Sequence, residues 1–134
     1  MKFMCLVWSE PGTFDQLTPA QDVVETDATI EADHALREAG RLILTQPMQG
    51  PEKAVTVKVR DGKIWAHDGP FVETKEWIGG FIIIEARDMA EAVEIVGRYP
   101  AARIGSIEIR PANEQFHSKT GEGRPAPAPA SPRG

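Results

Sequence analysis

Cysteine is almost absent from this chain of 134 residues, since Cys5 is the only one. A single cysteine excludes an intrachain disulfide, and with it the small secreted domains that several bridges hold together. We therefore expect a reducing, cytoplasmic location. Cys5 stands in an apolar run, where a thiol acts as a small hydrophobic side chain rather than as a nucleophile.

Basic runs and long hydrophobic runs are also lacking. The formal net charge is −5 and no cluster of Lys or Arg stands out, which argues against binding to nucleic-acid phosphates. The apolar run at residues 3–8 is far shorter than the ~20 residues that span a bilayer. We expect no nucleic-acid and no membrane partner.

Two kinds of motif are missing as well. The three histidines, His34, His67 and His117, lack the spacing of metal ligands. The sequence also contains neither a G-x-G-x-x-G motif nor a phosphate-loop lysine. We therefore predict no metal and no cofactor.

The composition and the order of the segments fit one soluble domain followed by a tail. Apolar residues make up 41% of the chain and charged residues 26%, which is ordinary for a globular protein. We place the domain at residues 1–111. Residues 112–134 end in the Pro/Ala-rich stretch RPAPAPASPRG, which buries too little apolar surface to order itself, so we predict a disordered tail.

Two helices and six strands are expected from the pattern of apolar and turn residues. Thr18 and Gln21 form a capping box that begins a helix, and Gly40 is suited to end it. A second helix starts at Asp88 and runs to about Arg98, with Met89, Ala92, Val93 and Val96 facing inward. The main strands are predicted at residues 3–8, 41–44, 81–84 and 106–109.

The remaining two strands form a hairpin around Asp61-Gly62. Asp-Gly between alternating runs is a strong signal for a two-residue turn, because both positions need positive φ. Such a turn pairs Arg60 with Lys63 and Lys58 with Trp65. It also puts the aliphatic residues on one face, as a single register requires.

The order β-α-β, hairpin, β-α-β predicts an α+β, ferredoxin-like sheet with an inserted β-hairpin and both helices on one face. The other face would be bare. Because an exposed apolar face usually finds a partner, we predict a homodimer with its sheets packed together. Pockets would form where helices, hairpin and partner meet.

The stretch HDGPFVETKEWIGGF, residues 67–81, carries a resemblance to a known family. Its DGPF, ETK and GGF segments resemble the signature of DGPF-domain proteins in the YCII-related family, and residues 85–111 are similar to that family's helix and last strand. The resemblance covers residues 1–111. It implies a dimeric α/β-barrel fold and, for the wider family, a His–Asp dyad and relatives that transform small aromatic compounds.

Asp68 is the candidate acid/base residue. Neither His34 nor His67 matches the position of the family's histidine, so both are kept only as candidate ligand-binding residues. Asp68 has an alternative role, since Asp before Gly-Pro can bond the backbone of its own turn.

Phe71, Glu73 and Lys75 complete the predicted ligand-binding set. Glu73 and Lys75 could present a carboxylate and an ammonium to one ligand, or form a solvated pair. Phe71 is an aromatic of the kind that fills cores and interfaces. Arg103 and Arg110 fit ion pairs better than an anion site.

Two functions follow from these residues. The first is a dimeric protein that binds a small cyclic or aromatic metabolite and could act on it as an enzyme. The second is a non-catalytic accessory or regulatory domain, in which the motif serves fold and dimer stability. The sequence leaves open whether the protein is an enzyme.

Overall fold

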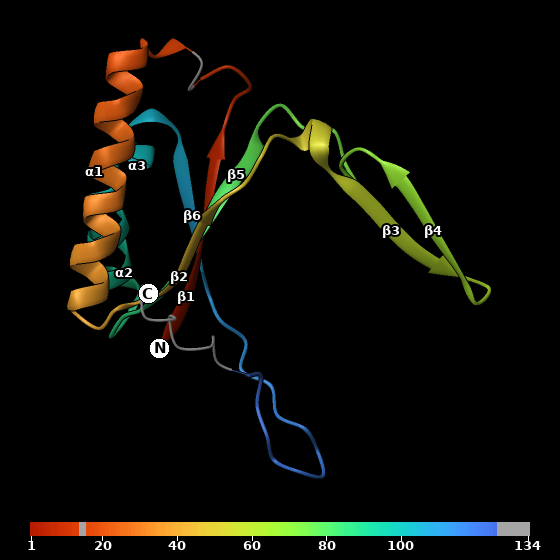
Figure 1. Cartoon of the computed structure of the whole chain (residues 1–134). Helices are drawn as coiled ribbons and strands as arrows, with labels where there is room; N and C mark the ends of the chain where they lie inside the picture. The colour runs from red at the N-terminus through yellow and green to blue at the C-terminus, as the bar shows by residue number, and fades with distance from the viewer. Residues whose placement is uncertain (14–15, 126–134) are drawn as a thin grey trace, which may run out of the picture.

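A four-stranded antiparallel sheet forms the body of the molecule in the computed structural model, which describes residues 1–13 and 16–125. The strand order is β2-β5-β1-β6, and the helices lie on one side of the sheet (Figure 1). The strands are β1 (Lys2–Ser9), β2 (Leu42–Pro47), β5 (Trp77–Glu85) and β6 (Ser106–Pro111), and the helices are α1 (Pro19–Glu38), α2 (Met89–Val96) and α3 (Pro100–Ile104), with a short 3₁₀ turn, η2 (Pro51–Lys53). This is the predicted α+β, ferredoxin-like arrangement.

The inserted hairpin, β3 (Val55–Arg60) and β4 (Lys63–Asp68), forms a separate two-stranded sheet that we call the arm. Its register is the predicted one, with Arg60 opposite Lys63 and Lys58 opposite Trp65. Asp61 and Gly62 have φ values of 52° and 73°, as a two-residue turn of this type requires. The arm leaves the sheet on the side opposite the helices (Figure 1).

The predicted capping box begins α1. The backbone N–H of Thr18 donates to Gln21 Oε1 at 2.9 Å, and the N–H of Gln21 donates to Thr18 Oγ1 at 3.1 Å. Gly40, with φ of 73°, follows the helix as expected. The partly buried residues of α1 include Glu25, Ala28, Ala32 and Leu36, which recur at spacings of three and four residues and so form one side of the helix.

The second helical region differs from the prediction. α2 ends at Val96, and Pro100 begins α3 instead of ending the helix, because proline suits the first turn of a helix as well as its end. Ala92 and Val96 are buried as predicted. The prediction was wrong for Met89 and Val93, which are 39% and 54% exposed.

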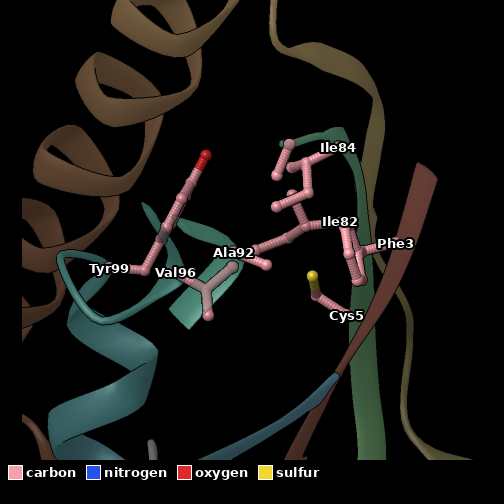
Figure 2. Close-up of a cluster of buried hydrophobic side chains, with 8 residues drawn as sticks. Phe3, Cys5, Ile82, Ile84, Ala92, Val96 and Tyr99 are labelled. Carbon is pink, nitrogen blue, oxygen red and sulfur yellow. The ribbon is translucent and has the colours of Figure 1, made fainter. Parts of the chain in front are cut away.

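The core lies between the sheet and the helices. It is built by alternate residues of β1 and β5 and by side chains from α2 and the turn after it: Phe3, Cys5, Ile82, Ile84, Ala86, Ala92, Val96 and Tyr99 (Figure 2). The Tyr99 hydroxyl donates to Asp33 Oδ1 of α1 at 2.7 Å, so a buried ring also ties α1 to the core.

The side chains between these core positions lie on the other side of the sheet. We call this surface the open face; its apolar residues are Met4, Leu6, Leu44, Phe81 and Ile83. Trp8 and Glu108 border it, joined by a hydrogen bond of 3.0 Å from the indole Nε1. None of the helices covers this face (Figure 1).

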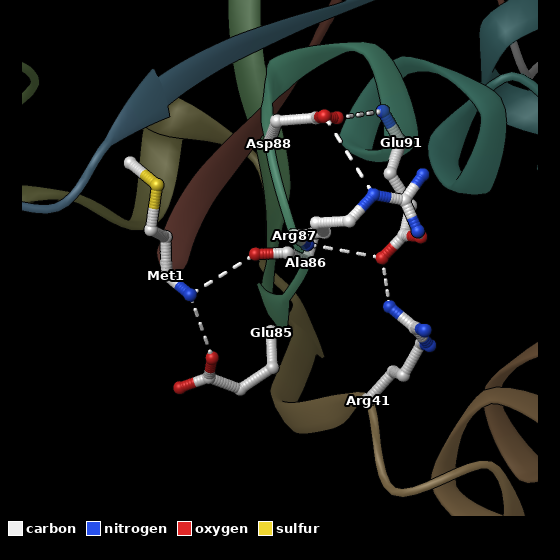
Figure 3. Close-up of polar contacts among 7 residues, drawn as sticks. All are labelled: Met1, Arg41, Glu85, Ala86, Arg87, Asp88 and Glu91. Carbon is white, nitrogen blue, oxygen red and sulfur yellow. Dashed lines mark hydrogen bonds and ion pairs between the residues drawn. The ribbon is translucent and has the colours of Figure 1, made fainter.

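A carboxylate joins α2 to the residue that precedes β2. Glu91 of α2 accepts a hydrogen bond from the backbone N–H of Arg87 at 3.0 Å and pairs with the guanidinium groups of Arg87 and Arg41 (Figure 3). The Arg87 backbone N–H first, and then Arg41, hold the pKa of Glu91 below its usual value. Glu91 therefore stays ionised and links the start of β2 to α2.

Residues 112–125 continue from β6 as an exposed segment. Phe116 and Gly123 form an isolated antiparallel bridge, and His117 Nδ1 accepts hydrogen bonds from the backbone N–H groups of Lys119 and Thr120. Most of the Pro/Ala-rich stretch, residues 126–134, lies outside the described residues, so the disordered tail stays a prediction.

The buried thiol of Cys5 predicts a loss of stability at high pH. Burial raises the pKa of Cys5 from 9.0 to about 11, so the folded state holds its proton when the unfolded chain has lost it. The proton held by the Cys5 thiol stabilises the folded state fully below pH 9, and this contribution is lost as the pH rises toward 11. At pH 10 we expect a loss of about 1.4 kcal/mol.

Urea unfolding of the parent and of Cys5→Ala at pH 8 and pH 10 measures this effect. The loss between the two pH values should be about 1.4 kcal/mol smaller in Cys5→Ala. The measurements stop at pH 10 because burial also raises the pKa of Tyr99. At higher pH the Tyr99 hydroxyl would add its own pH dependence to the free energy of unfolding. Equal pH dependence of the two proteins would contradict the prediction.

Candidate functional site

The motif at residues 67–81 is divided between a strand end, a loop and the start of another strand. β4 ends at Asp68, and β5 begins at Trp77, four residues before the predicted start at Phe81. In the pairing with β1, Val7 lies opposite Gly80 and Trp8 opposite Ile78. Gly79 is therefore the extra residue of a β-bulge.

The second glycine of the pair has a different role. A Cβ added to Gly80 would lie 3.0 Å from the Gln46 carbonyl oxygen and 3.1 Å from Pro47 Cα, whereas a Cβ at Gly79 meets nothing within 4 Å. Gly80 thus allows β5 and β2 to approach closely. The two glycines therefore have different geometric roles, a bulge at Gly79 and a close approach of strands at Gly80.

The turn at the base of the arm is held by backbone groups. Gly69 has φ of 105°, its N–H donates to the Ala54 carbonyl at 2.8 Å, and its own carbonyl accepts from Thr56 Oγ1 at 2.8 Å. The Asp68 carboxylate makes no hydrogen bond to any residue that the structure describes. The turn is therefore formed without the side-chain bond that was its alternative role.

A cleft of about 630 Å³ lies where the arm meets the sheet. Its size falls within the range of small-molecule sites. The lining comes from the end of β1, from η2, from the turn after β4 and from the start of β5: Glu10, Pro11, Pro51, Glu52, Gly69, Pro70, Glu73, Thr74, Lys75 and Trp77. Three prolines and an indole ring supply apolar walls, while three carboxylates and one ammonium supply polar groups.

The charged groups of the cleft are solvent-exposed. Lys75 Nζ lies 3.5 Å from Glu10 Oε1, and the side chains are 85% and 56% exposed. An exposed pair of this kind contributes well under ~1 kcal/mol to stability. Lys75 is thus available to change partner and contact a bound molecule at little cost.

The predicted site residues do not all meet at this cleft. Glu73 and Lys75 line it, and Asp68 stands next to the lining residue Gly69. His67 pairs with Thr56 on the arm. Phe71 is 72% exposed and lies under Lys58, whose Nζ is 5.2 Å from the ring centroid.

His34 is the most distant candidate. It lies in α1, on the helix-covered side of the sheet, and its side chain is exposed. The arm lies on the other side (Figure 1), and the cleft lies at its base. Within one chain, His34 and the cleft therefore do not come together.

Sequence reasoning missed the opposite wall of the cleft. Glu10-Pro11 follows β1 and Pro51-Glu52 lies in η2 after β2, and neither pair was among the predicted site residues. Each contains a carboxylate residue next to a proline, and this combination could have been noted as a signal for the missed wall of the cleft. Their proximity to Lys75 comes from the sheet, since antiparallel pairing brings Ser9 of β1 opposite Trp77 and Pro47 of β2 opposite Gly80 of β5.

Arg103 and Arg110 form the ion pairs that the sequence favoured. Arg103 Nη2 lies 3.4 Å from Glu25 Oε2, and Arg110 Nη2 lies 2.8 Å from Glu108 Oε2. The bonds from Arg110 and then from Trp8 lower the pKa of Glu108. Neither arginine lines the cleft.

Two searches bear on other classes of site. Over residues 1–13 and 16–125, no group of three or more His, Cys, Asp or Glu residues is arranged to hold a metal ion. In the same part of the chain, no helix is both long and apolar enough to cross a membrane.

Comparison with known proteins gives the family. The YCII-related domain matches residues 1–114. The chain belongs to the YCII-related family. This confirms the resemblance that the DGPF, ETK and GGF segments carried.

A curated relative of this YCII-related protein is an uncharacterized protein, R00369, of Rhizobium meliloti (strain 1021). The two are 34% identical over 76 residues, which is 55% of this chain and 61% of the relative. The match therefore spans less than two thirds of that protein's length.

A solved structure of similar fold is the 5-chloro-2-hydroxyhydroquinone dehydrochlorinase TftG from Burkholderia phenoliruptrix AC1100, in complex with 2,5-dihydroxybenzoquinone. The TM-score is 0.54 at 15% identity, covering 86% of this chain and 96% of that one. At this identity the likeness concerns the fold alone. It supports the α+β fold of dimeric α/β-barrel type.

Proposed function

We propose that this YCII-related protein is a homodimer that binds a small cyclic or aromatic metabolite in the cleft at the base of the arm. The observation that carries the proposal is the lining of the cleft. Trp77 and the prolines offer flat apolar surface to a ring, and the glutamates can accept hydrogen bonds from ring hydroxyl groups. Lys75 can donate to a ring oxygen.

Asp68 is the proposed acid/base group. It ends β4 beside Gly69, which lines the cleft, so a modest rotation of its side chain would bring the carboxylate toward a bound ring. Glu73 and Lys75 would orient that ring. TftG, whose complex holds 2,5-dihydroxybenzoquinone, supports the choice of substrate class by analogy of fold.

The homodimer is proposed from the open face. Met4, Leu6, Phe81 and Ile83 lie side by side on β1 and β5, and a contiguous apolar surface of this kind is typical of an interface. A second sheet packed on it would bury these side chains from both copies.

One observation favours the alternative of a non-catalytic accessory or regulatory domain. Asp68, Glu73 and Lys75 are all exposed, whereas catalytic carboxylates and lysines are commonly tuned by burial. In that alternative the DGPF motif would serve only the arm's turn and the sheet.

Thermal unfolding with 2,5-dihydroxybenzoquinone as the probe tests the proposal. The parent should be stabilised by the probe. Lys75→Met should keep the melting temperature of the ligand-free parent but bind the probe about tenfold more weakly, because a charge-assisted hydrogen bond of about 1.5 kcal/mol is lost. Asp68→Asn should likewise keep its melting temperature and lose stabilisation by the probe.

The controls make the same chemical changes away from the cleft. Lys119→Met and Asp27→Asn alter exposed residues of the C-terminal segment and of α1, and both should respond to the probe as the parent does. If the parent shows no response, and if Asp68→Asn and Lys75→Met unfold or become monomeric, the accessory-domain alternative is the correct one.

A further inference from the structure

The arm carries an apolar strip that none of the residues described by the structure covers. We call it the valine face; its apolar residues are Val55, Val57, Val59, Ile64 and Ala66, which share one side of the hairpin with Asp68 at its base. Val57 is 61% exposed and Ile64 is 76% exposed. A run of aliphatic side chains at such exposure marks an interaction surface in a soluble protein.

Within residues 1–13 and 16–125, the arm also makes few contacts with the body of the molecule. Its extensive contacts are those between β3 and β4 themselves, and the arm is not paired with the four-stranded sheet. An isolated two-stranded hairpin is at best marginally stable in water. A surface that packs against the valine face would therefore stabilise the arm as well as remove the strip from solvent.

The position of the arm points to the occupant. It leaves the sheet on the side of the open face (Figure 1). Six-residue strands extend about 20 Å at ~3.3 Å per residue, and a second sheet packed on the open face would lie about 10 Å away. Any copy seated on the open face must then lie alongside the arm, which is long enough to pass its sheet and reach its helices.

The two faces of the arm differ in polarity. The face opposite the valines carries Lys58, Arg60 and Lys63. When a second copy covers the valine face, these charged side chains stay in solvent, so the packing buries none of them.

We propose that the arm clasps a second copy of this chain, with its valine face buried against that copy. The inference rests on the proposed homodimer and adds to it an interface that the open face does not supply. By two-fold symmetry each copy gives one arm and receives one. The cleft lies at the arm's base, with Pro51 and Gly69 among its lining residues, so the clasp also fixes one wall of the ligand site.

Sedimentation equilibrium of the full chain and three variants tests the proposal. Val57→Asp places a charge in the valine face and should raise the dimer dissociation constant at least about tenfold. Val57→Ile keeps the side chain apolar and β-branched, and its dissociation constant should stay within about twofold of the parent's. Because residue 57 is exposed in the single chain, both variants should keep the parent's circular dichroism spectrum.

Ile83→Asp separates failure of the clasp from failure of the dimer. A dissociation constant for Val57→Asp within about twofold of the parent's, together with a monomeric Ile83→Asp, would overturn the clasp and leave the open-face dimer standing. A parent that is monomeric at about 100 µM would overturn both proposals.

Discussion

Replacing Ile84 with alanine is expected to lower the free energy of unfolding by about 3 to 4 kcal/mol. Ile84 is completely buried and is among the largest such side chains of the core. It stands in β5, between β1 and β2, and packs in the cluster with Phe3 and Tyr99 (Figure 2). Strands on both sides limit how far the core can collapse into the cavity.

The neighbouring residue is the matched control. Ile83 has the same side chain in the same strand but lies half-buried on the open face. Ile83→Ala should cost less than about 1.5 kcal/mol in urea unfolding at protein concentrations low enough to keep the chain monomeric. Equal losses for the two substitutions would show that the core does not lie on the helix-covered side of the sheet.

Gly105→Ala is expected to destabilise the protein by about 3 kcal/mol, at the upper end of ordinary overpacking. Gly105 connects α3 to β6, and a Cβ there would lie 2.3 Å from the Trp8 carbonyl oxygen. That oxygen belongs to the backbone of β1, so relief would require β1 and β6 to move apart. The contact of Trp8 with Glu108, which spans the same two strands, would loosen as well.

Gly79→Ala makes the same change where an added Cβ meets nothing within 4 Å. Its melting temperature should stay within about 2 °C of the parent's, whereas Gly105→Ala should lose ~8 °C or more on the scale for domains of this size. Calorimetry measures both. A Gly105→Ala protein as stable as Gly79→Ala would contradict the close approach of β1 to Gly105.

Local signals accounted for much of the fold. The capping box at Thr18 and Gln21 and the turn at Asp61-Gly62 depend on hydrogen bonds and φ values within a few residues, so they could be predicted without tertiary information. The same applies to the register of the arm. Strand ends were less predictable: β5 begins at Trp77 because antiparallel pairing with β1 continues through the bulge at Gly79.

The buried side of α2 could not be predicted from the apolar pattern of the sequence alone. Met89 and Val93 were predicted inward because apolar residues recur at helical spacing. The helix has only eight residues, and its orientation is set by Ala92 and Val96, whose small size lets it lie close to the sheet. Packing against the sheet thus decided which side of an apolar helix became buried.

Only part of the candidate site could be predicted from the sequence. Glu73 and Lys75 come from one continuous motif and were found there. Glu10 and Glu52 lie 63 and 21 positions before Glu73 in the numbering, and no local pattern connects residues so far apart. His34 is the opposite case. It was a candidate only because of its chemical type, and the fold places it on the other side of the sheet.

By itself the sequence determined the family, the element order and the turns, because these depend on short-range geometry and on a continuous motif. Only the tertiary structure decided that a cleft exists at the base of the arm and that the valine face is left uncovered. The cleft arises where β1, η2 and β5 meet across long stretches of chain, and the valine face is exposed because the arm pairs with no strand of the four-stranded sheet. Contacts of that kind depend on the whole sheet, and no segment of the sequence contains them alone.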